Sequence, residues 1–424
     1  MPSTLMSTAD PVIQAIVALP IILIGAALGG RVARAVGQPQ VLGELVGGVV
    51  LGNLGLAGIP WFQFIRDNSL IGITAGLGAL ILLFTAGLQS TVGEMKRVGA
   101  TSLLVAVLGV ITPFGLGWGL GALLLPDRSA YVHAFLGATL TATSVGITAR
   151  VLQDLGRSTT AEARIILGAA VIDDVLGLMI LAVVSGVITA ANAGSGFRPE
   201  QAAIILLKAG VFLFGALAAG AKLSPVLFRH ASRVETRGVL IVTALAFCFL
   251  LAWLAGLVGL APIVGAFAAG LIIEQGHLQV FADQGERPLE NQLSLVSRIT
   301  VPVFFVLMGM RVDLAAFGRP GVLGLAALLT LAAIVGKQAC ALGVPRRGLD
   351  RLTIGLGMIP RGEVGLIFAN VGLGLTVAGE RIVDEKIYSA VVIMVIVTTL
   401  VTPPALKWSL RRADARTQGP KDAR

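Results

Sequence analysis

The sequence predicts an all-α, polytopic membrane protein with about 13 transmembrane helices. Its 424 residues are 56% hydrophobic and only 13% charged, and the mean hydropathy is +0.90. A soluble domain carries about 25% charged residues. The apolar residues form long runs, and short loops between these runs hold most of the charge. This composition excludes a soluble globular protein.

The predicted spans follow one another along nearly the whole chain. Most of these runs are long enough to cross about 30 Å of hydrocarbon as a helix. In chain order, the spans cover 12–33, 40–58, 70–90, 99–125, 131–152, 162–190, 201–228, 238–256, 259–276, 294–312, 320–343, 351–374 and 387–410.

Basic residues set the predicted orientation, with the N-terminus outside and the C-terminus in the cytoplasm. In this orientation, 22 of the 32 lysines and arginines lie in cytoplasmic loops, toward the cytoplasmic ends of spans or in the tail, and 7 lie in outside loops or at outer span ends. Cytoplasmic loops carry such an excess of positive charge. The other three, Lys208, Lys337 and Arg361, lie within spans. The net charge of +9 therefore indicates a membrane surface rather than a nucleic-acid partner.

Two pairs of spans indicate an internal repeat. Span 40–58 carries GQPQVLGELVGGVVLG, which resembles GLAPIVGAFAAGLI in span 259–276, and spans 70–90 and 294–312 resemble each other in the same way. Both pairs are seven spans apart, and an odd offset inverts the second copy in the membrane. The layout is six spans, a linker span and six inverted spans, which is typical of secondary transporters.

Spans 131–152 and 351–374 are poor continuous helices at corresponding positions of the two halves. The first contains TLTATSVGITARV, which is dense in Thr, Ser and Gly, and the second contains GLGMIPRGEVGLIF, where Pro360 and Gly362 flank a charge. Broken helices placed in this way mark a binding site near the midplane of transporters. Their half-helix ends carry partial charges, and we expect Glu363 and Arg361 to compensate part of them.

Two adjacent aspartates, Asp173 and Asp174, lie in the middle of the apolar run 162–190. A carboxylate near the membrane midplane costs several kcal/mol unless it is paired, hydrated or protonated. Successive helical residues point about 100° apart, so one aspartate can line an ion cavity while the other contacts a neighbouring helix. The pair indicates ion or proton handling, and the alternative is a polar kink satisfied by neighbouring backbone.

Three further residues of the spans are candidates for the same site. Lys337 needs an anionic partner if it is buried, and Asp173 is the candidate; alternatively, Lys337 extends to the cytoplasmic interface. Thr143 and Ser144 offer hydroxyl or carbonyl oxygens to a cation, and the alternative is hydrogen bonding to the helix backbone.

The remaining polar residues of the spans carry weaker signals. Glu44 is expected near the interface, and the two cysteines lack metal-binding spacing. We expect solvated positions for the three histidines, His133, His230 and His277. No cofactor is predicted, and the expected partners are membrane lipid, monovalent cations and protons.

Two other classes of membrane protein fit the sequence less well. An intramembrane aspartyl protease needs two aspartates that face each other from different helices, whereas Asp173 and Asp174 are adjacent on one helix. A sensor or scaffold that transports nothing needs neither a buried lysine nor two broken helices. Ion transport therefore explains more of the sequence than either alternative.

Long motifs resemble one family of transporters. TATSVGITARVLQDLG followed by ARIILGAAVIDDVLGL resembles the core of NapA-type sodium/proton antiporters, which belong to the monovalent cation/proton antiporter superfamily. The resemblance continues through GLAPIVGAFAAGLI, PVFFVLMGMRVDL and GMIPRGEVGLI, so it covers nearly the whole chain. It implies the sodium/proton antiporter fold and a homodimer in the bacterial inner membrane, with no enzymatic activity and no cofactor.

The resemblance also implies residue roles. Asp174 resembles the carboxylate that binds sodium or protons, Asp173 resembles the partner of the span-eleven lysine, here Lys337, and Glu363 resembles the acidic residue of the second broken helix. Family members with Asp before the ion-binding aspartate resemble electrogenic exchangers, those with Asn electroneutral ones, and those with Gln potassium-efflux relatives. The expectation is electrogenic exchange of Na⁺, and also Li⁺, for protons by alternating access, with competition at Asp174 and Asp173. Potassium/proton exchange is the alternative.

The family architecture implies a dimer domain and a mobile core domain. We expect the dimer domain at 12–92 and 238–313, the core domain at 99–190 and 320–410, a linker helix at 201–228, and a short basic cytoplasmic tail at 411–424. Within the core domain, we expect the broken helices 131–152 and 351–374, the aspartate helix 162–190 and the lysine helix 320–343.

Overall fold

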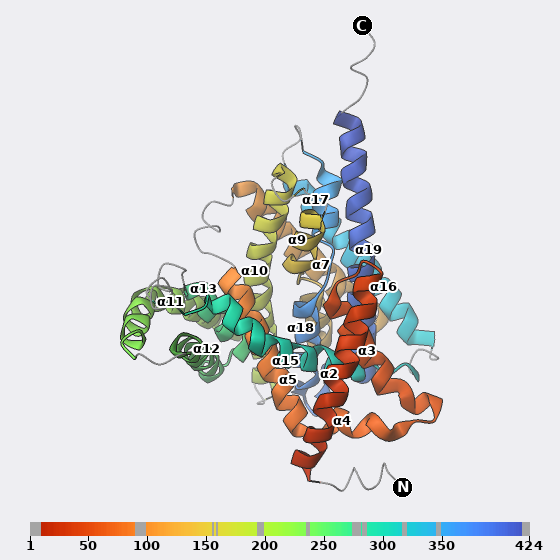
Figure 1. The fold of residues 1–424 in the computed structure, drawn as a ribbon. Coiled ribbons are helices and arrows are strands. Elements are labelled where there is room, and N and C mark those ends of the chain that lie inside the picture. The colour runs from red at the N-terminus through yellow and green to blue at the C-terminus, as the bar shows by residue number, and fades with distance from the viewer. Residues whose placement is uncertain are drawn as a thin grey trace. The chain divides into compact units, whose positions relative to one another are not determined.

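The computed structural model of the protein consists almost entirely of helices (Figure 1). It describes residues 10–89, 99–154, 157, 160–192, 199–234, 238–273, 281, 286–315, 320–344 and 349–417. Within these residues the only strands are β1 (Thr376–Val377) and β2 (Glu380–Arg381), which pair antiparallel as one short hairpin. The predicted helical fold class is confirmed.

Nine of the described helical segments are long and apolar enough to cross a membrane, where about 20 apolar residues are needed. They are α2 (Pro11–Ala35), α3 (Gln40–Asn53) with the 3-10 helix η1 (Leu54–Ala57), α5 (Ser69–Gln89), α7 (Ala100–Leu124), α10 (Ala161–Asn192), α12 (Val239–Leu257), α15 (Leu289–Met310), α16 (Pro320–Gln338) with the 3-10 helix η4 (Ala339–Gly343), and α19 (Glu385–Thr417). The chain is therefore a multi-pass membrane protein.

The other four predicted spans take different forms. Span 131–152 is divided into α8 (Ala130–Thr139) and α9 (Val145–Asp154), and span 351–374 into α17 (Arg351–Gly357) and α18 (Glu363–Leu373). α11 (Pro199–Ala231) bends by 47° between Gly220 and Lys222, and α13 (Pro262–Ile272) has only 11 residues. Positions 274–276 of the predicted span 259–276 lie outside the described residues. The count of 13 crossings and the inverted repeat stay predictions.

The chain divides into two compact units, each built from two separate stretches of sequence. Unit 1 comprises 1–93 and 185–314, and unit 2 comprises 94–184 and 315–424. α11, predicted as a linker, falls within unit 1, and α10 passes from unit 2 into unit 1 at Ser185. The names dimer domain and core domain remain predictions.

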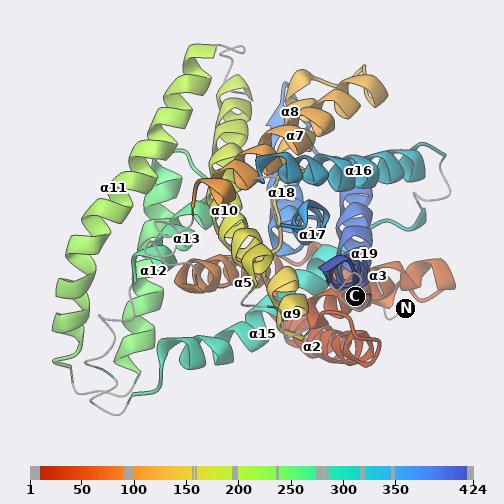
Figure 2. The ribbon, with the colours of Figure 1, turned by 90° about the horizontal axis from the view of Figure 1, so that it is seen from above.

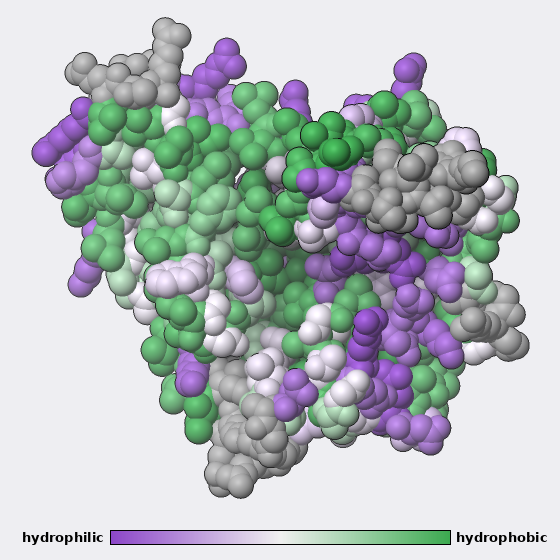
Figure 3. All heavy atoms as spheres, turned by 90° about the horizontal axis from the view of Figure 1, so that it is seen from below, coloured by the Kyte–Doolittle hydropathy of each residue, from purple (hydrophilic) through white to green (hydrophobic). Residues whose placement is uncertain are grey.

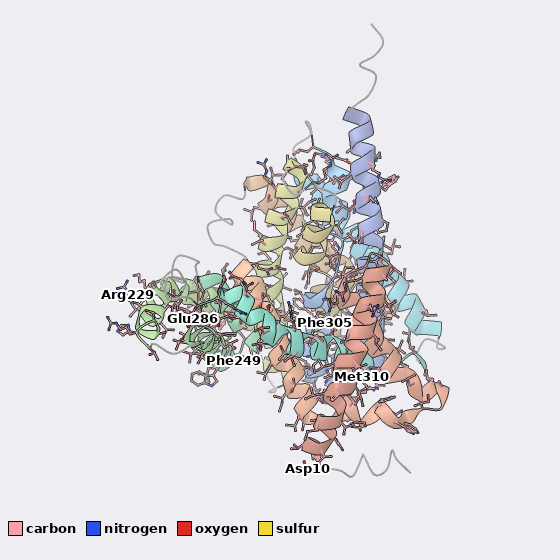
Figure 4. The ribbon with its side chains drawn as sticks, in the orientation of Figure 1. Asp10, Arg229, Phe249, Glu286, Phe305 and Met310 are labelled. Atoms are coloured by element: carbon pink, nitrogen blue, oxygen red, sulfur yellow. The ribbon has the colours of Figure 1, made fainter. Side chains whose placement is uncertain are left out.

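Glycines allow the helix backbones of unit 1 to approach closely. A Cβ on Gly29 of α2 or on Gly43 of α3 would clash with the backbone of the other helix, and Gly87 of α5 and Gly270 of α13 meet in the same way. Small residues at helix interfaces serve this purpose in membranes. α15 contacts both α3 and α5 and buries Phe305, which is labelled in Figure 4. The short helices η2 (Pro60–Phe62) and α4 (Gln63–Asp67) lie between α3 and α5 in the sequence.

Unit 2 packs its long helices around the two broken ones. α16 contacts α7 and α19, and α19 also contacts α9, α17 and α18; α7 and α16 lie side by side in Figure 2. One apolar cluster joins Val105 of α7, Ala169 of α10, Cys340 of η4 and Met358 after α17. The broken helices are therefore held by continuous helices over much of their length.

Polar contacts tie the broken helices of unit 2 to their neighbours. Asp350 caps α17 by accepting a hydrogen bond from the Leu352 amide, and it also pairs with Arg412 of α19 at 3.1 Å. Arg128, just before α8, pairs with Glu380 at 2.7 Å and with Asp384 at 3.1 Å. Ion pairs thus connect the segments that flank both breaks to other parts of unit 2.

Apolar side chains are also abundant on the outside of the protein. Figure 3 shows hydrophobic residues over much of the face in view, and the exposed set includes Ile24 and Val32 of α2, Ile111 of α7 and Leu207 of α11. Such surface is stable against lipid tails, which are as apolar as the side chains. The basic residue Arg229, labelled in Figure 4, is exposed at the end of α11.

The position of Glu44 near the membrane interface stays a prediction; its side chain is 3% exposed and accepts a hydrogen bond from Gln40. The predicted solvated position of His133 is wrong. His133 is buried in α8, where a ring nitrogen lies 2.9 Å from the carbonyl oxygen of Leu125. His277 lies outside the described residues.

Candidate functional site

The two helix breaks lie against each other in unit 2. Residues 140–144 separate α8 from α9, and residues 358–362 separate α17 from α18. The backbone amide of Ser144 in the first break donates to the carbonyl of Pro360 in the second at 2.8 Å. Since each break leaves backbone groups without helical partners, this contact satisfies groups from both breaks at once.

Threonine hydroxyls strengthen the contact between the broken helices. Thr148 donates to the carbonyl of Gly357 at 2.6 Å, and Thr143 donates to the carbonyl of Met358 at 3.4 Å. Both acceptors lie at the end of α17, where helix carbonyls lack amide partners. The backbone bonding weighed for Thr143 from the sequence is present, but its acceptor belongs to the other broken helix.

Arg361 carries a positive charge into the centre of unit 2. Its side chain is fully buried, and its guanidinium donates to the carbonyl of Ala142 in the first break and to that of Ala333 in α16, the latter at 3.4 Å. Thr399 of α19 in turn donates to the backbone carbonyl of Arg361 at 2.6 Å. The charge thus lies beside the carbonyl end of a half-helix, where a cation is favourable. The side chain of Glu363, the first residue of α18, lies outside the described residues.

Lys337 and Asp173 form a buried ion pair. Nζ of Lys337 lies 2.8 Å from Oδ1 of Asp173, and both side chains are 0% exposed. The pairing expected from the sequence is present, and the alternative in which Lys337 extends to the interface is wrong. Breaking such a pair on one side leaves an uncompensated buried charge, which is strongly unfavourable.

Asp174 differs from its neighbour in environment. It is 8% exposed, whereas Asp173 is fully buried. Consecutive residues of a helix point about 100° apart, so the backbone of α10 directs the two carboxylates to different surroundings. One aspartate is held by a lysine, and the other retains some access from outside the packed core.

Four formal charges are buried in the described part of unit 2. They belong to Asp173, Asp174, Lys337 and Arg361. With both aspartates ionised, the set is neutral. An added monovalent cation would make the set positive unless a proton left, so these four charges favour the release of a proton when a cation binds.

Several residues that support this arrangement carried no clear signal in the sequence. Thr148 and Thr399 hold the breaks, and Gly109 of α7 lies where an added Cβ would be 3.3 Å from Nζ of Lys337. Hydroxyls inside an apolar helix, as in the TTLVT of α19, are the signal that points to Thr399. A glycine beside a lysine of a distant helix has no such signal, because the contact is set by packing.

A family model described as "Sodium/hydrogen exchanger, transmembrane" matches residues 21–412. The chain belongs to this family. Its members are transporters rather than enzymes, so the predicted absence of enzymatic activity and the predicted antiporter class are confirmed. The narrower NapA type stays a prediction.

Three curated relatives match over nearly their whole length. The chain is 36% identical to "High-affinity Na(+)/H(+) antiporter NhaS3" of Synechocystis sp., with 92% of this chain and 89% of the relative covered. It is 33% identical to "Na(+)/H(+)-K(+) antiporter GerN" of Bacillus cereus, with 95% and 98% covered. It is 30% identical to a "Na(+)/H(+) antiporter" of Enterococcus hirae, with 94% and 98% covered.

The fold resembles that of a solved antiporter. The sodium proton antiporter MjNhaP1 from Methanocaldococcus jannaschii matches with a TM-score of 0.69 over 96% of this chain and 98% of that chain, at 17% identity. At this identity the match shows the fold alone. It agrees with the helical membrane architecture of Figure 1.

Proposed function

We propose that the protein exchanges sodium, and also lithium, for protons across the membrane, with Asp174 and Asp173 as the cation ligands. The observation that carries this proposal is the buried Lys337–Asp173 pair next to Asp174 on α10. A cation that reaches Asp173 must displace the ammonium group of Lys337. Cation and proton then compete for the same carboxylates, which couples the two fluxes without a separate gate.

The buried charges support electrogenic exchange. When Asp174 is protonated and Lys337 is paired, Asp173, Lys337 and Arg361 give the site one net positive charge. When sodium binds both aspartates, the site becomes neutral if Asp174 and Lys337 each release a proton. Two protons then exchange for one sodium ion, and the charge on the site differs between the two transporting forms.

The oxygens near the first break complete the proposed coordination. Thr143 and Ser144 are buried in unit 2, within a segment whose backbone is not helical. Such backbone lines ion sites in transporters with broken helices. We assign Arg361 and Glu363 to charge compensation at the breaks rather than to cation binding.

The transport cycle we propose is alternating access. Unit 2 is the proposed mobile core domain, and unit 1, without α11, is the proposed dimer domain. The family membership supports a homodimer in a bacterial inner membrane. The 22-to-7 bias of basic residues supports an orientation with the N-terminus outside and the C-terminus in the cytoplasm.

Potassium/proton exchange is the second candidate. It is favoured by one observation, namely that a relative 33% identical to this chain is named an "Na(+)/H(+)-K(+) antiporter". The two carboxylates favour a small, strongly hydrated cation, which forms close contacts with hard oxygen ligands, so sodium is the first choice.

Proton flux in proteoliposomes tests the proposal. Purified protein is reconstituted with a pH-sensitive dye inside, and Na⁺, Li⁺ or K⁺ is added outside as the chloride. We expect proton movement with sodium and lithium, and a faster sodium response when the membrane potential is held at zero. Empty liposomes are the control for leakage.

Each result of this assay decides between named alternatives. A response to potassium alone would show that the protein is a potassium/proton exchanger, and the proposed site residues would stay the same. A sodium response that is insensitive to the membrane potential rules out the two-proton stoichiometry. No response to any cation overturns the proposed transport function.

A further inference from the structure

The Lys337–Asp173 pair is confined by a helix that contributes no side chain to it. α7 passes the pair at Gly109, where a Cβ would lie 3.3 Å from Nζ of Lys337 and 3.7 Å from Oδ1 of Asp173. The same Cβ would lie 2.7 Å from Sγ of Cys340. Any residue other than glycine at position 109 would therefore place its Cβ against the ammonium group of Lys337.

The close approach of α7 is built into several contacts along one face. A Cβ on Gly336 would lie 3.0 Å from Cα of Pro113 in α7, and a Cβ on Gly343 would lie 2.9 Å from the backbone nitrogen of Val105. α7 thus has contacts that fix its distance from α16 and η4 on both sides of Gly109. Since this packing is dense, α7 cannot retreat freely to accommodate a methyl group.

We propose that Gly109 is a positioning residue of the ion site, because its lack of a side chain leaves room for Lys337 to reach Asp173. This inference rests on the proposed function, in which sodium competes with Lys337 for Asp173. Gly109 touches neither cation nor proton in this account. It acts only through the geometry of the ion pair.

A methyl group at this position has a defined consequence. The ammonium group sits at the end of a flexible side chain, so it moves more easily than the backbone of α7. Its hydrogen bond to Asp173 is 2.8 Å long, and such bonds weaken when distance or angle is disturbed. A weaker Lys337–Asp173 pair competes less with sodium, so sodium binds at lower concentrations.

The test compares Gly109→Ala with glycines of the same helix that face open space. A Cβ on Gly115 or on Gly119 would meet nothing within 4 Å, so Gly115→Ala and Gly119→Ala are the matched controls. In proteoliposomes at fixed pH, we expect Gly109→Ala to lower the apparent KM for sodium by about threefold or more. The maximal rate should change less than the KM, and both controls should keep the parent KM.

A second comparison, made in the Cys340→Ala protein, distinguishes an effect on the ion pair from an effect on packing. Cys340→Ala removes the sulfur that the new methyl would contact at 2.7 Å, but it leaves Nζ of Lys337 at 3.3 Å. We expect the fall in KM to persist when Gly109→Ala is compared with its parent in the Cys340→Ala protein. If Gly109→Ala alone fails to fold, the KM for sodium is compared between Cys340→Ala and Cys340→Ala combined with Gly109→Ala.

Three outcomes overturn the inference. These are a parent-like KM for Gly109→Ala, an effect that disappears in the Cys340→Ala background, and an equal shift in Gly115→Ala or Gly119→Ala. These outcomes leave the proposed function intact if the parent protein exchanges sodium for protons. If the parent protein shows no cation-dependent proton flux, both the proposed function and the inference about Gly109 are wrong.

Discussion

At the scale of single residues, we propose that the two aspartates of α10 have different tasks, because they have different surroundings. Asp173 is fully buried and held at 2.8 Å by Lys337, whereas Asp174 is 8% exposed. A buried ion pair is weak evidence for stability, since desolvation offsets much of the attraction between the charges. Its presence in a membrane-spanning unit is better explained by a switch in which one partner can be exchanged for a cation.

The ion pair predicts a strong interaction between two substitutions. Lys337→Gln leaves Asp173 buried without its cation, so we expect a loss of about 3–5 kcal/mol in the free energy of unfolding. Asp173→Asn combined with Lys337→Gln removes both charges and should recover most of this loss. Thermal unfolding of the parent, Lys337→Gln and the double variant in detergent measures the effect. Equal stability of Lys337→Gln and the parent would show that Asp173 is compensated by another group.

At the scale of elements, the site depends on two helices that break at matching places. The break between α8 and α9 is joined to the break between α17 and α18 by the Ser144–Pro360 hydrogen bond and by two threonine hydroxyls. A break inside a membrane is stable only if its backbone groups find partners. The breaks are therefore mutually dependent, and Arg361 and Thr399 connect them to α16 and α19.

Removal of one hydroxyl tests this dependence. Thr148→Val leaves the carbonyl of Gly357 without its donor, so we expect a loss of about 1–3 kcal/mol in unfolding free energy together with slower transport. Thr330→Val is the matched control, because Thr330 donates only within its own helix, to the carbonyl of Ala326 at 2.7 Å. Similar losses in both variants would show that the contact between the breaks has no special role.

The cap of α17 offers a separate test at the same scale. Asp350 accepts from the amide of Leu352 and the hydroxyl of Thr353, and it pairs with Arg412 of α19. Asp350→Ala removes all three interactions, whereas Arg412→Ala removes only the last. We expect Asp350→Ala to cost about 1–2 kcal/mol and Arg412→Ala less, because the Arg412–Asp350 pair is partly solvated. The reverse order in thermal unfolding would contradict this assignment of the cap.

At the scale of the whole molecule, the sequence predicted the membrane fold better than it predicted the contacts. Runs of apolar residues and the basic bias need no tertiary information, so the helical class and most helix bounds followed directly. The break positions followed from clustered Gly, Pro and Thr. The burial of Glu44 and His133, and the contact of Gly109 with the ion pair, depend on how distant helices pack. Periodicity along one helix does not encode such contacts.

Competition at shared carboxylates predicts how transport responds to pH. Lower pH favours the form in which Asp174 and Lys337 hold their protons, so the apparent KM for sodium should rise as the pH falls, by up to roughly tenfold per pH unit for each proton displaced. The maximal rate at saturating sodium should change less. Initial rates over a grid of sodium concentration and pH measure both quantities. A KM that is constant across pH, with only the maximal rate changing, would contradict direct competition.

We propose that sodium and protons are exchanged at Asp174. The most direct test is sodium-driven proton flux in proteoliposomes with Asp174→Asn, beside Asp67→Asn, which alters an exposed aspartate of α4. Asn keeps the size of the side chain but removes the charge and the proton site. We expect Asp174→Asn to lose the flux at saturating sodium and Asp67→Asn to retain it. If Asp174→Asn moves sodium at the parent rate, the cation binds elsewhere and the proposed site is wrong.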